Sequence, residues 1–199
     1  MTANVEEQEL KDRLNLIETM IAEGRRSTGS WGWVFFLWGV AYYVAILWSS
    51  LGHSFLAWPV TMLSACALTG ILIWRRGASQ PQTTMGRAIG SIWEAMGISM
   101  LILFPALGFS GKLADQHVLV AIVAAMLGAA NAASSMILKW KMQFACAVVW
   151  WAAAVASCFG TINQSSIAFL VAIFFCQIVF GVYMMIVEAA ECRQGASHE

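Results

Sequence analysis

The chain has 199 residues, of which 60% are apolar and 11% are charged, and its formal net charge is zero. Soluble domains carry about a quarter charged residues, so this chain has too few charges to cover a surface that faces water. A net charge of zero also provides no basic field to attract nucleic acid. The composition therefore excludes an ordinary soluble domain and a nucleic-acid-binding protein, and it favours an integral membrane protein.

Residues 1–28 are predicted to form an acidic amphipathic helix on the cytoplasmic side of the membrane. Apolar residues recur in it at spacings of four, three and four and form one stripe: Leu10, Leu14, Ile17 and Ile21. Acidic residues dominate the other face, whereas helices that lie on a membrane surface are normally basic there. We therefore interpret the stripe as a protein contact, with the basic loops of this chain, a second copy or a partner protein. Contact with lipid is the alternative.

Six apolar segments follow, each long enough to cross the hydrocarbon core, which takes about 20 residues. In chain order they lie at about 31–51, 55–74, 88–109, 117–138, 142–162 and 165–187. Within lipid the backbone must satisfy its own hydrogen bonds, so each segment is predicted to be an α-helix. The predicted fold is all-α, an integral membrane bundle of six transmembrane helices at residues 29–190, with a cytoplasmic tail at 191–199.

Ten of the eleven basic residues fall on one side of this predicted bundle. They precede the first span, follow the sixth, or lie in the loops between spans two and three and between spans four and five. Only Lys112 falls on the opposite side. Because cytoplasmic loops are enriched in lysine and arginine, both termini are predicted to lie in the cytoplasm.

The ends of several spans carry similar short sequences. Ile71-Leu72-Ile73-Trp74-Arg75 closes the second span, and Ile137-Leu138-Lys139-Trp140-Lys141 closes the fourth. The similarity is consistent with three repeated helical hairpins in the same orientation. The alternative interpretation is that every span needs aromatic and basic anchors where it leaves the membrane.

The entry into the first span resembles a group of known proteins. The residues concerned are Leu16-Ile17-Glu18, the pair Arg25-Arg26, and the run Trp31-Gly32-Trp33-x-Phe35-x-Leu37-Trp38-Gly39. This part of the chain is similar to the start of an uncharacterised group of small bacterial multi-pass inner-membrane proteins. The resemblance implies a bacterial inner-membrane location, and it carries over no activity and no functional residue.

Polar side chains are rare within the predicted spans, so they mark candidate functional positions. Glu94 in the third span and Asn131 in the fourth lie at similar depths in the cytoplasmic half. With them we predict a polar intramembrane layer that also includes Thr69, Ser134 and Gln177. The layer is interpreted either as a site for a proton or a solute, or as a structural lock. In the lock, protonated Glu94 forms a hydrogen bond with Asn131, or Glu94 pairs with Arg87.

No arrangement of residues indicates catalysis, a cofactor or a metal site, so we expect none of these. Two functions remain. The first is a membrane-embedded interaction, regulatory or assembly protein, whose N-terminal helix contacts a cytoplasmic partner or a second copy in a homo-oligomer. The alternative is a small solute or proton transporter or channel, built around Glu94 and Asn131. In either case the lipid bilayer is the surrounding partner and nucleic acid is not expected.

Overall fold

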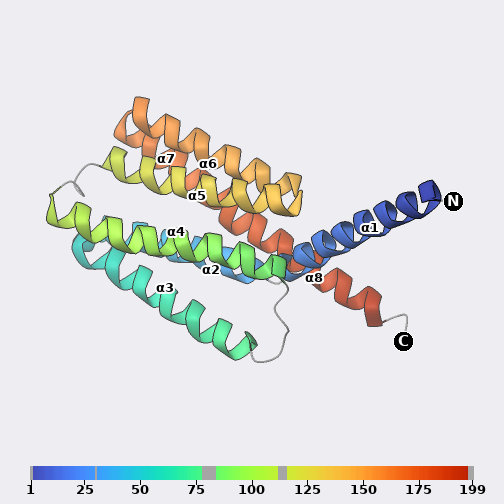
Figure 1. Ribbon diagram of the computed structural model, residues 1–199. Helices are drawn as coiled ribbons and strands as arrows, with labels where there is room; N and C mark the ends of the chain where they lie inside the picture. Colours follow the sequence, from blue (N-terminus) through green and yellow to red (C-terminus); the bar gives the residue numbers. More distant parts are fainter. Residues whose placement is uncertain (1, 30, 78–83, 112–115, 197–199) are drawn as a thin grey trace.

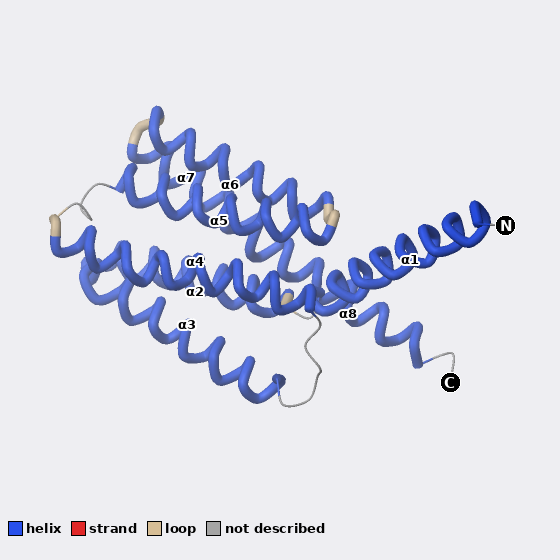
Figure 2. Tube along the Cα trace, viewed as in Figure 1, coloured by secondary structure: helices blue, strands red, loops and turns tan. Residues whose placement is uncertain are grey.

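A computed structural model describes residues 2–29, 31–77, 84–111 and 116–196, and nearly all of them are helical (Figures 1 and 2). The elements in chain order are α1 (Thr2–Gly29), α2 (Gly32–Trp48), η1 (Ser49–His53), α3 (Ser54–Gly77), α4 (Thr84–Phe109), α5 (Gln116–Leu138), α6 (Lys141–Phe159), α7 (Ile162–Ile173), η3 (Phe174–Val179) and α8 (Phe180–Ala196). η3 is a π-helical turn within the last rod. η1 is the connection between α2 and α3, and its backbone breaks from the helical form at Gly52, where φ is 91°. No strand occurs in the described segments, so the all-α prediction is confirmed.

Six helical segments are long and apolar enough to cross a membrane, and they coincide with the six predicted spans. They are Gly32–Gly52, Leu56–Arg75, Thr84–Phe109, His117–Leu138, Lys141–Phe159 and Ile162–Ala190. The last is the longest because α7, η3 and α8 run on as one rod. The molecule is therefore a helical bundle of the multi-pass membrane type.

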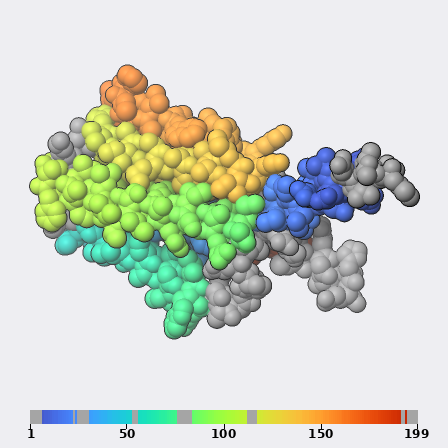
Figure 3. Space-filling view, viewed as in Figure 1, coloured from blue at the N-terminus to red at the C-terminus, as the bar shows by residue number. Residues whose placement is uncertain are grey.

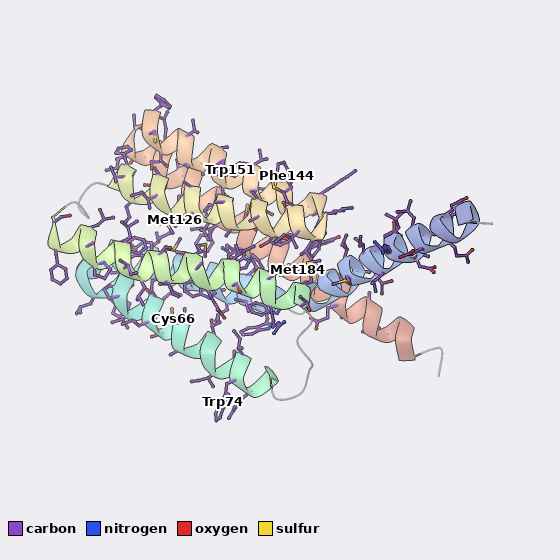
Figure 4. The ribbon with its side chains drawn as sticks, viewed as in Figure 1. Cys66, Trp74, Met126, Phe144, Trp151 and Met184 are labelled. Atoms are coloured by element: carbon purple, nitrogen blue, oxygen red, sulfur yellow. The ribbon has the colours of Figure 1, made fainter. Side chains whose placement is uncertain are left out.

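Helices α5 and α6 form the most closely packed pair in the bundle (Figure 1). Gly128 of α5 lies against the indole of Trp151 on α6, where a Cβ atom would collide with the ring; Figure 4 labels Trp151. In lipid, close van der Waals packing holds helices together, and small residues let two backbones approach. The contact places Gly128 and Trp151 at the same level of the antiparallel pair.

Helices α2 and α8 make a second close contact through glycine. A Cβ atom on Gly32 would lie 2.8 Å from the carbonyl oxygen of Gly181, and one on Gly181 would lie 2.8 Å from the backbone nitrogen of Phe36. Beside this contact, the ring of Phe35 stands edge-on to Phe180 of α8 and to Trp93 of α4, at centroid distances of 5.5 and 5.1 Å. Aromatic packing therefore joins α4 to the core.

Helices α3 and α4 are the outer members of the bundle. α3 packs mainly on α2, while α4 packs on α5 and on α1. Ile89 is the only buried residue in α4. Trp74, near the end of α3, is 81% exposed and points away from the bundle (Figure 4). Most of the surface of these two helices is apolar and faces outward, as lipid contact requires.

Helix α1 leaves the bundle at the end where both termini lie (Figure 1). Its base is fixed at Gly24, where a Cβ atom would lie 2.5 Å from Cγ of Met85 and 3.1 Å from Cδ2 of Leu138. From Glu7 to Met20 every residue of the helix is exposed, and in Figure 3 this part stands clear of the bundle on the face shown. The arm is thus attached at its base and free along its outer length.

Candidate functional site

Glu94 lies on the outer surface of α4, and not in the interior layer that the sequence predicted. The residue before it, Trp93, faces the bundle and donates a hydrogen bond from its indole Nε1 to Oγ of Ser134, at 3.2 Å. Successive residues of an α-helix are rotated by about 100°. Because Trp93 occupies the inward position, the next side chain is carried to the outside.

Asn131 is fully buried in α5. Its Nδ2 donates to the carbonyl oxygen of Leu127 at 2.9 Å, and its Oδ1 has no hydrogen-bond partner within the described part of the chain. With Glu94 outside, the expected hydrogen bond between Glu94 and Asn131 is not formed. The structure therefore separates the two residues on which the predicted polar layer was centred.

The other predicted members of the polar layer do not lie together either. Thr69 is half-buried on α3, which packs on α2 and not on α5, so it lies apart from Asn131; its Oγ1 is enclosed and unpaired among the described residues. Ser134 is fully buried one turn from Asn131 and receives the indole hydrogen bond of Trp93. Gln177, in η3, is 2% exposed. Ser134 and Gln177 thus stay in the interior.

Gln143 of α6 is an interior polar residue that the sequence analysis missed. It is fully buried, and neither Oε1 nor Nε2 has a hydrogen-bond partner in the described segments. A signal for it exists, since it continues the buried face of α6 at helical spacing. The buried residues of α6 are Gln143, Cys146, Ala147, Trp150, Ala153 and Ser157. The predicted span began at Met142, one residue before Gln143, and no role was predicted for Gln143.

The helix registers place three buried amides in neighbouring turns. Measured from the contact of Gly128 with Trp151, Asn131 and Gln143 lie three and eight residues towards the end of the bundle from which α1 leaves. The Sγ of Cys176 donates to the carbonyl oxygen of Cys146 at 3.5 Å, which sets the level of Gln177. At 1.5 Å per residue, the three amides span about 8 Å along the bundle axis.

We call Asn131, Gln143 and Gln177 the amide layer. The Oε1 of Gln177 is also unpaired among the described atoms, and its side chain packs where a Cβ atom on Gly39 would lie, 2.8 Å from Cβ of Gln177. A buried amide without a partner costs about 1–3 kcal/mol in proteins. Gln177 also lies on a π-helical turn, a feature frequent at functional sites. The layer contains donors and acceptors and no carboxylate, so its chemistry suits a neutral polar molecule.

The apolar stripe of α1 is a second candidate surface. Leu10, Leu14 and Ile17 are 59%, 53% and 51% exposed, and Ile21 is half-buried nearer the base. None of the basic loops of the same chain, as far as they are described, covers the three outer residues. Two ion pairs run along the arm, Lys11 with Glu7 at 2.7 Å and Arg13 with Glu9 at 2.6 Å.

Metal-binding groups are not evident in the residues that the structure describes, where no three His, Cys, Asp or Glu side chains gather. Comparison with known proteins adds no further guide: the chain matches no protein-family model, and no curated protein or solved structure is significantly similar to it. Two features of the chain itself therefore mark candidate functional surfaces, the uncovered stripe of α1 and the amide layer.

Proposed function

We propose that this protein is a membrane-embedded interaction protein, regulatory or structural in an assembly, which uses α1 to hold a partner protein or a second copy. The observation that supports this most directly is the exposure of Leu10, Leu14 and Ile17 on an arm that stands clear of the bundle. Full burial of one such side chain contributes about 1.5–3 kcal/mol. A continuous apolar stripe that faces water is typical of a binding surface.

A protein fits this surface better than lipid does. The polar side of α1 is mainly acidic, with Glu7, Glu9, Asp12 and Glu18 against Lys11 and Arg13. Anionic headgroups attract basic segments and repel acidic ones. The arm also extends beyond the bundle and does not fold back along its end (Figure 1).

The proposal places the protein in a bacterial inner membrane, with both termini in the cytoplasm. The basic residues near the end from which α1 leaves favour that orientation, and the resemblance of residues 16–39 favours that membrane. Three repeated hairpins remain part of the proposal as the origin of the similar span ends. In support, the partners α2 with α3, α4 with α5 and α6 with α7 are in contact.

The test is the accessibility of two leucines to a thiol reagent. Leu14 lies on the stripe and Leu16 lies off it, and they are similarly exposed at 53% and 61%. Leu14→Cys and Leu16→Cys are labelled with a water-soluble maleimide, once in native membranes and once in purified protein diluted in detergent. We expect Leu14→Cys to react several-fold more slowly in native membranes only, because a bound protein shields it. Equal rates for the two variants in both settings would contradict the proposal.

A second candidate function, a small solute transporter or channel, is favoured by the amide layer alone. Unpaired atoms on Asn131, Gln143 and Gln177 offer both donors and acceptors in the membrane interior. A neutral polar solute that crosses the membrane through the bundle could form hydrogen bonds with these atoms. Glu94 takes no part in this version, because it lies on the outer surface.

Swelling of proteoliposomes in urea or glycerol tests the second candidate. Gln143→Leu removes both unpaired atoms while filling a similar volume, and Met142→Leu is the control at the neighbouring residue, which is 52% exposed. If the amide layer conducts, swelling stops in Gln143→Leu and continues in Met142→Leu. Vesicles with the unaltered protein that swell no faster than empty ones would exclude this function for the two solutes.

A further inference from the structure

We propose that the protein bound by α1 is a second copy of this chain, and that the two arms form a parallel coiled coil. The inference rests on the proposed function, since it names the partner of the same stripe. It is carried by three observations on the arm: the spacing of its apolar residues, the signs of the charges beside them, and the attachment of its base.

The spacing is that of a heptad repeat. In a coiled coil the seam positions a and d alternate at intervals of three and four residues. Leu10, Leu14, Ile17 and Ile21 follow one another at four, three and four, so they occupy d, a, d and a in turn. No other assignment of these four residues to positions a and d fits these intervals. The outer three are uncovered in the single chain.

The charges beside the seam are complementary between two parallel copies. In this register Arg13 takes position g and Glu18 takes position e of the next heptad. Across a parallel pair, a g residue faces the e residue five positions further along the partner, and such pairs select the partner. Arg13 of each copy therefore meets Glu18 of the other. The dimer thus contains two equivalent ion pairs, each between a positive and a negative side chain.

The ion pairs within the single chain do not prevent Arg13 from pairing with Glu18 of a second copy. Arg13 contacts Glu9 at 2.6 Å, but both side chains are well exposed, at 72% and 60%. Exposed pairs of this kind contribute little to stability. Arg13 can thus turn from Glu9 to the partner copy at small cost.

The membrane favours the parallel arrangement. Copies inserted in the same direction extend α1 from the same face, so two arms can meet side by side only in parallel. Each arm is also held at its base by the packing of Gly24 on Met85 and Leu138, so its direction is set before the copies meet. A seam of two heptads is marginal for free helices, and confinement to one membrane raises the effective concentration of the partner.

Disulfide crosslinking in native membranes tests the seam. Leu14→Cys at position a and Ile17→Cys at position d are oxidised beside Leu16→Cys at position c. Seam positions bring two copies within the Cα distance of about 4.4–6.8 Å that a disulfide needs, and position c points away. We expect a covalent dimer from the first two variants only. The unaltered chain, with its five cysteines, gives the background.

A charge exchange tests the register. In the Leu14→Cys background, Arg13→Glu should lower the yield of crosslinked dimer several-fold, because it places two acidic residues opposite each other. Adding Glu18→Arg should restore the yield. Residues 13 and 18 are five apart and do not face each other within one helix, so the restoration can arise only between chains. Failure of the double variant to recover would overturn the coiled coil in this register.

The outcomes separate this inference from the proposed function. If neither seam cysteine crosslinks, yet Leu14→Cys is still shielded from maleimide in native membranes, the partner is a different protein and the second copy is excluded. If Leu14→Cys is neither crosslinked nor shielded, the proposed function fails as well. Equal crosslinking at positions 14, 16 and 17 would indicate random collision of the arms and would also overturn the coiled coil.

Discussion

Gly128 of α5 lies directly against the indole of Trp151 on α6, with no room for a side chain between the two helices. Gly128→Leu should therefore push α5 and α6 apart, and overpacking of this kind costs about 1–3 kcal/mol or more. The measurement is the midpoint of thermal unfolding in detergent. Gly97→Leu in α4 is the control, because apart from the adjacent residues and the nearby backbone of α4 itself no atom lies within 4 Å of its Cβ position. Similar midpoints for both variants would contradict the α5–α6 contact.

The hydrogen bond from Trp93 to Ser134 gives a second prediction. Trp93→Phe keeps the aromatic contact with Phe35 and removes the 3.2 Å bond to Oγ of Ser134. Interhelical hydrogen bonds in membranes contribute about 0.6–2 kcal/mol, so the unfolding midpoint should fall by a small but measurable amount. Trp74→Phe, the same change at the 81% exposed Trp74, should leave it unaltered. An equal fall in both variants would show that the bond does not stabilise the bundle.

The position of Glu94 gives a third prediction. A structural lock through Glu94 would require its loss to destabilise the bundle. Because Glu94 lies on the outer surface of α4, Glu94→Gln should keep the unfolding midpoint or raise it, since a charged side chain in the hydrocarbon region is costly. A clear fall in the midpoint of the purified protein would show that the carboxyl has a stabilising partner after all.

The burial of Gln143 gives a fourth prediction. Gln143→Leu should raise the unfolding free energy by about 1–3 kcal/mol, because it replaces two unpaired polar atoms with an apolar group of similar volume. Gln143→Ala should lower it, since it leaves a cavity. Chemical denaturation of the three proteins in the same detergent makes the comparison. If the leucine variant is as unstable as the alanine variant, the amide has a partner that leucine cannot replace.

The six spans could be predicted because length and lack of charge are enough to identify a membrane helix. The face that each helix turns inward could not, because lipid and the bundle interior are both apolar. In α4 this ambiguity decided the outcome: nothing in the sequence showed whether Trp93 or Glu94 would face the core. A soluble helix would have shown its inward side by the contrast between apolar and polar faces.

The candidate site was predicted in part for the same reason. Asn131, Ser134 and Gln177 do lie in the interior, and Asn131 was found because it is a polar residue within an apolar span. Gln143 was not predicted: it lies two residues after Lys141, at the start of its span, and the sequence does not show that this turn is buried. The packing of the bundle shows that the buried face of α6 extends as far as Gln143.

The attachment of α1 at Gly24 also determines how far its stripe reaches from the membrane. Leu10 lies fourteen residues before Gly24, a distance of about 21 Å along an α-helix. The headgroup layer on each side of the hydrocarbon core is only about 5–8 Å thick. Even at a slant of about 45° the tip of the arm would rise above the headgroups. A protein that binds the stripe of α1 can therefore do so in water, where lipid does not compete for the same surface.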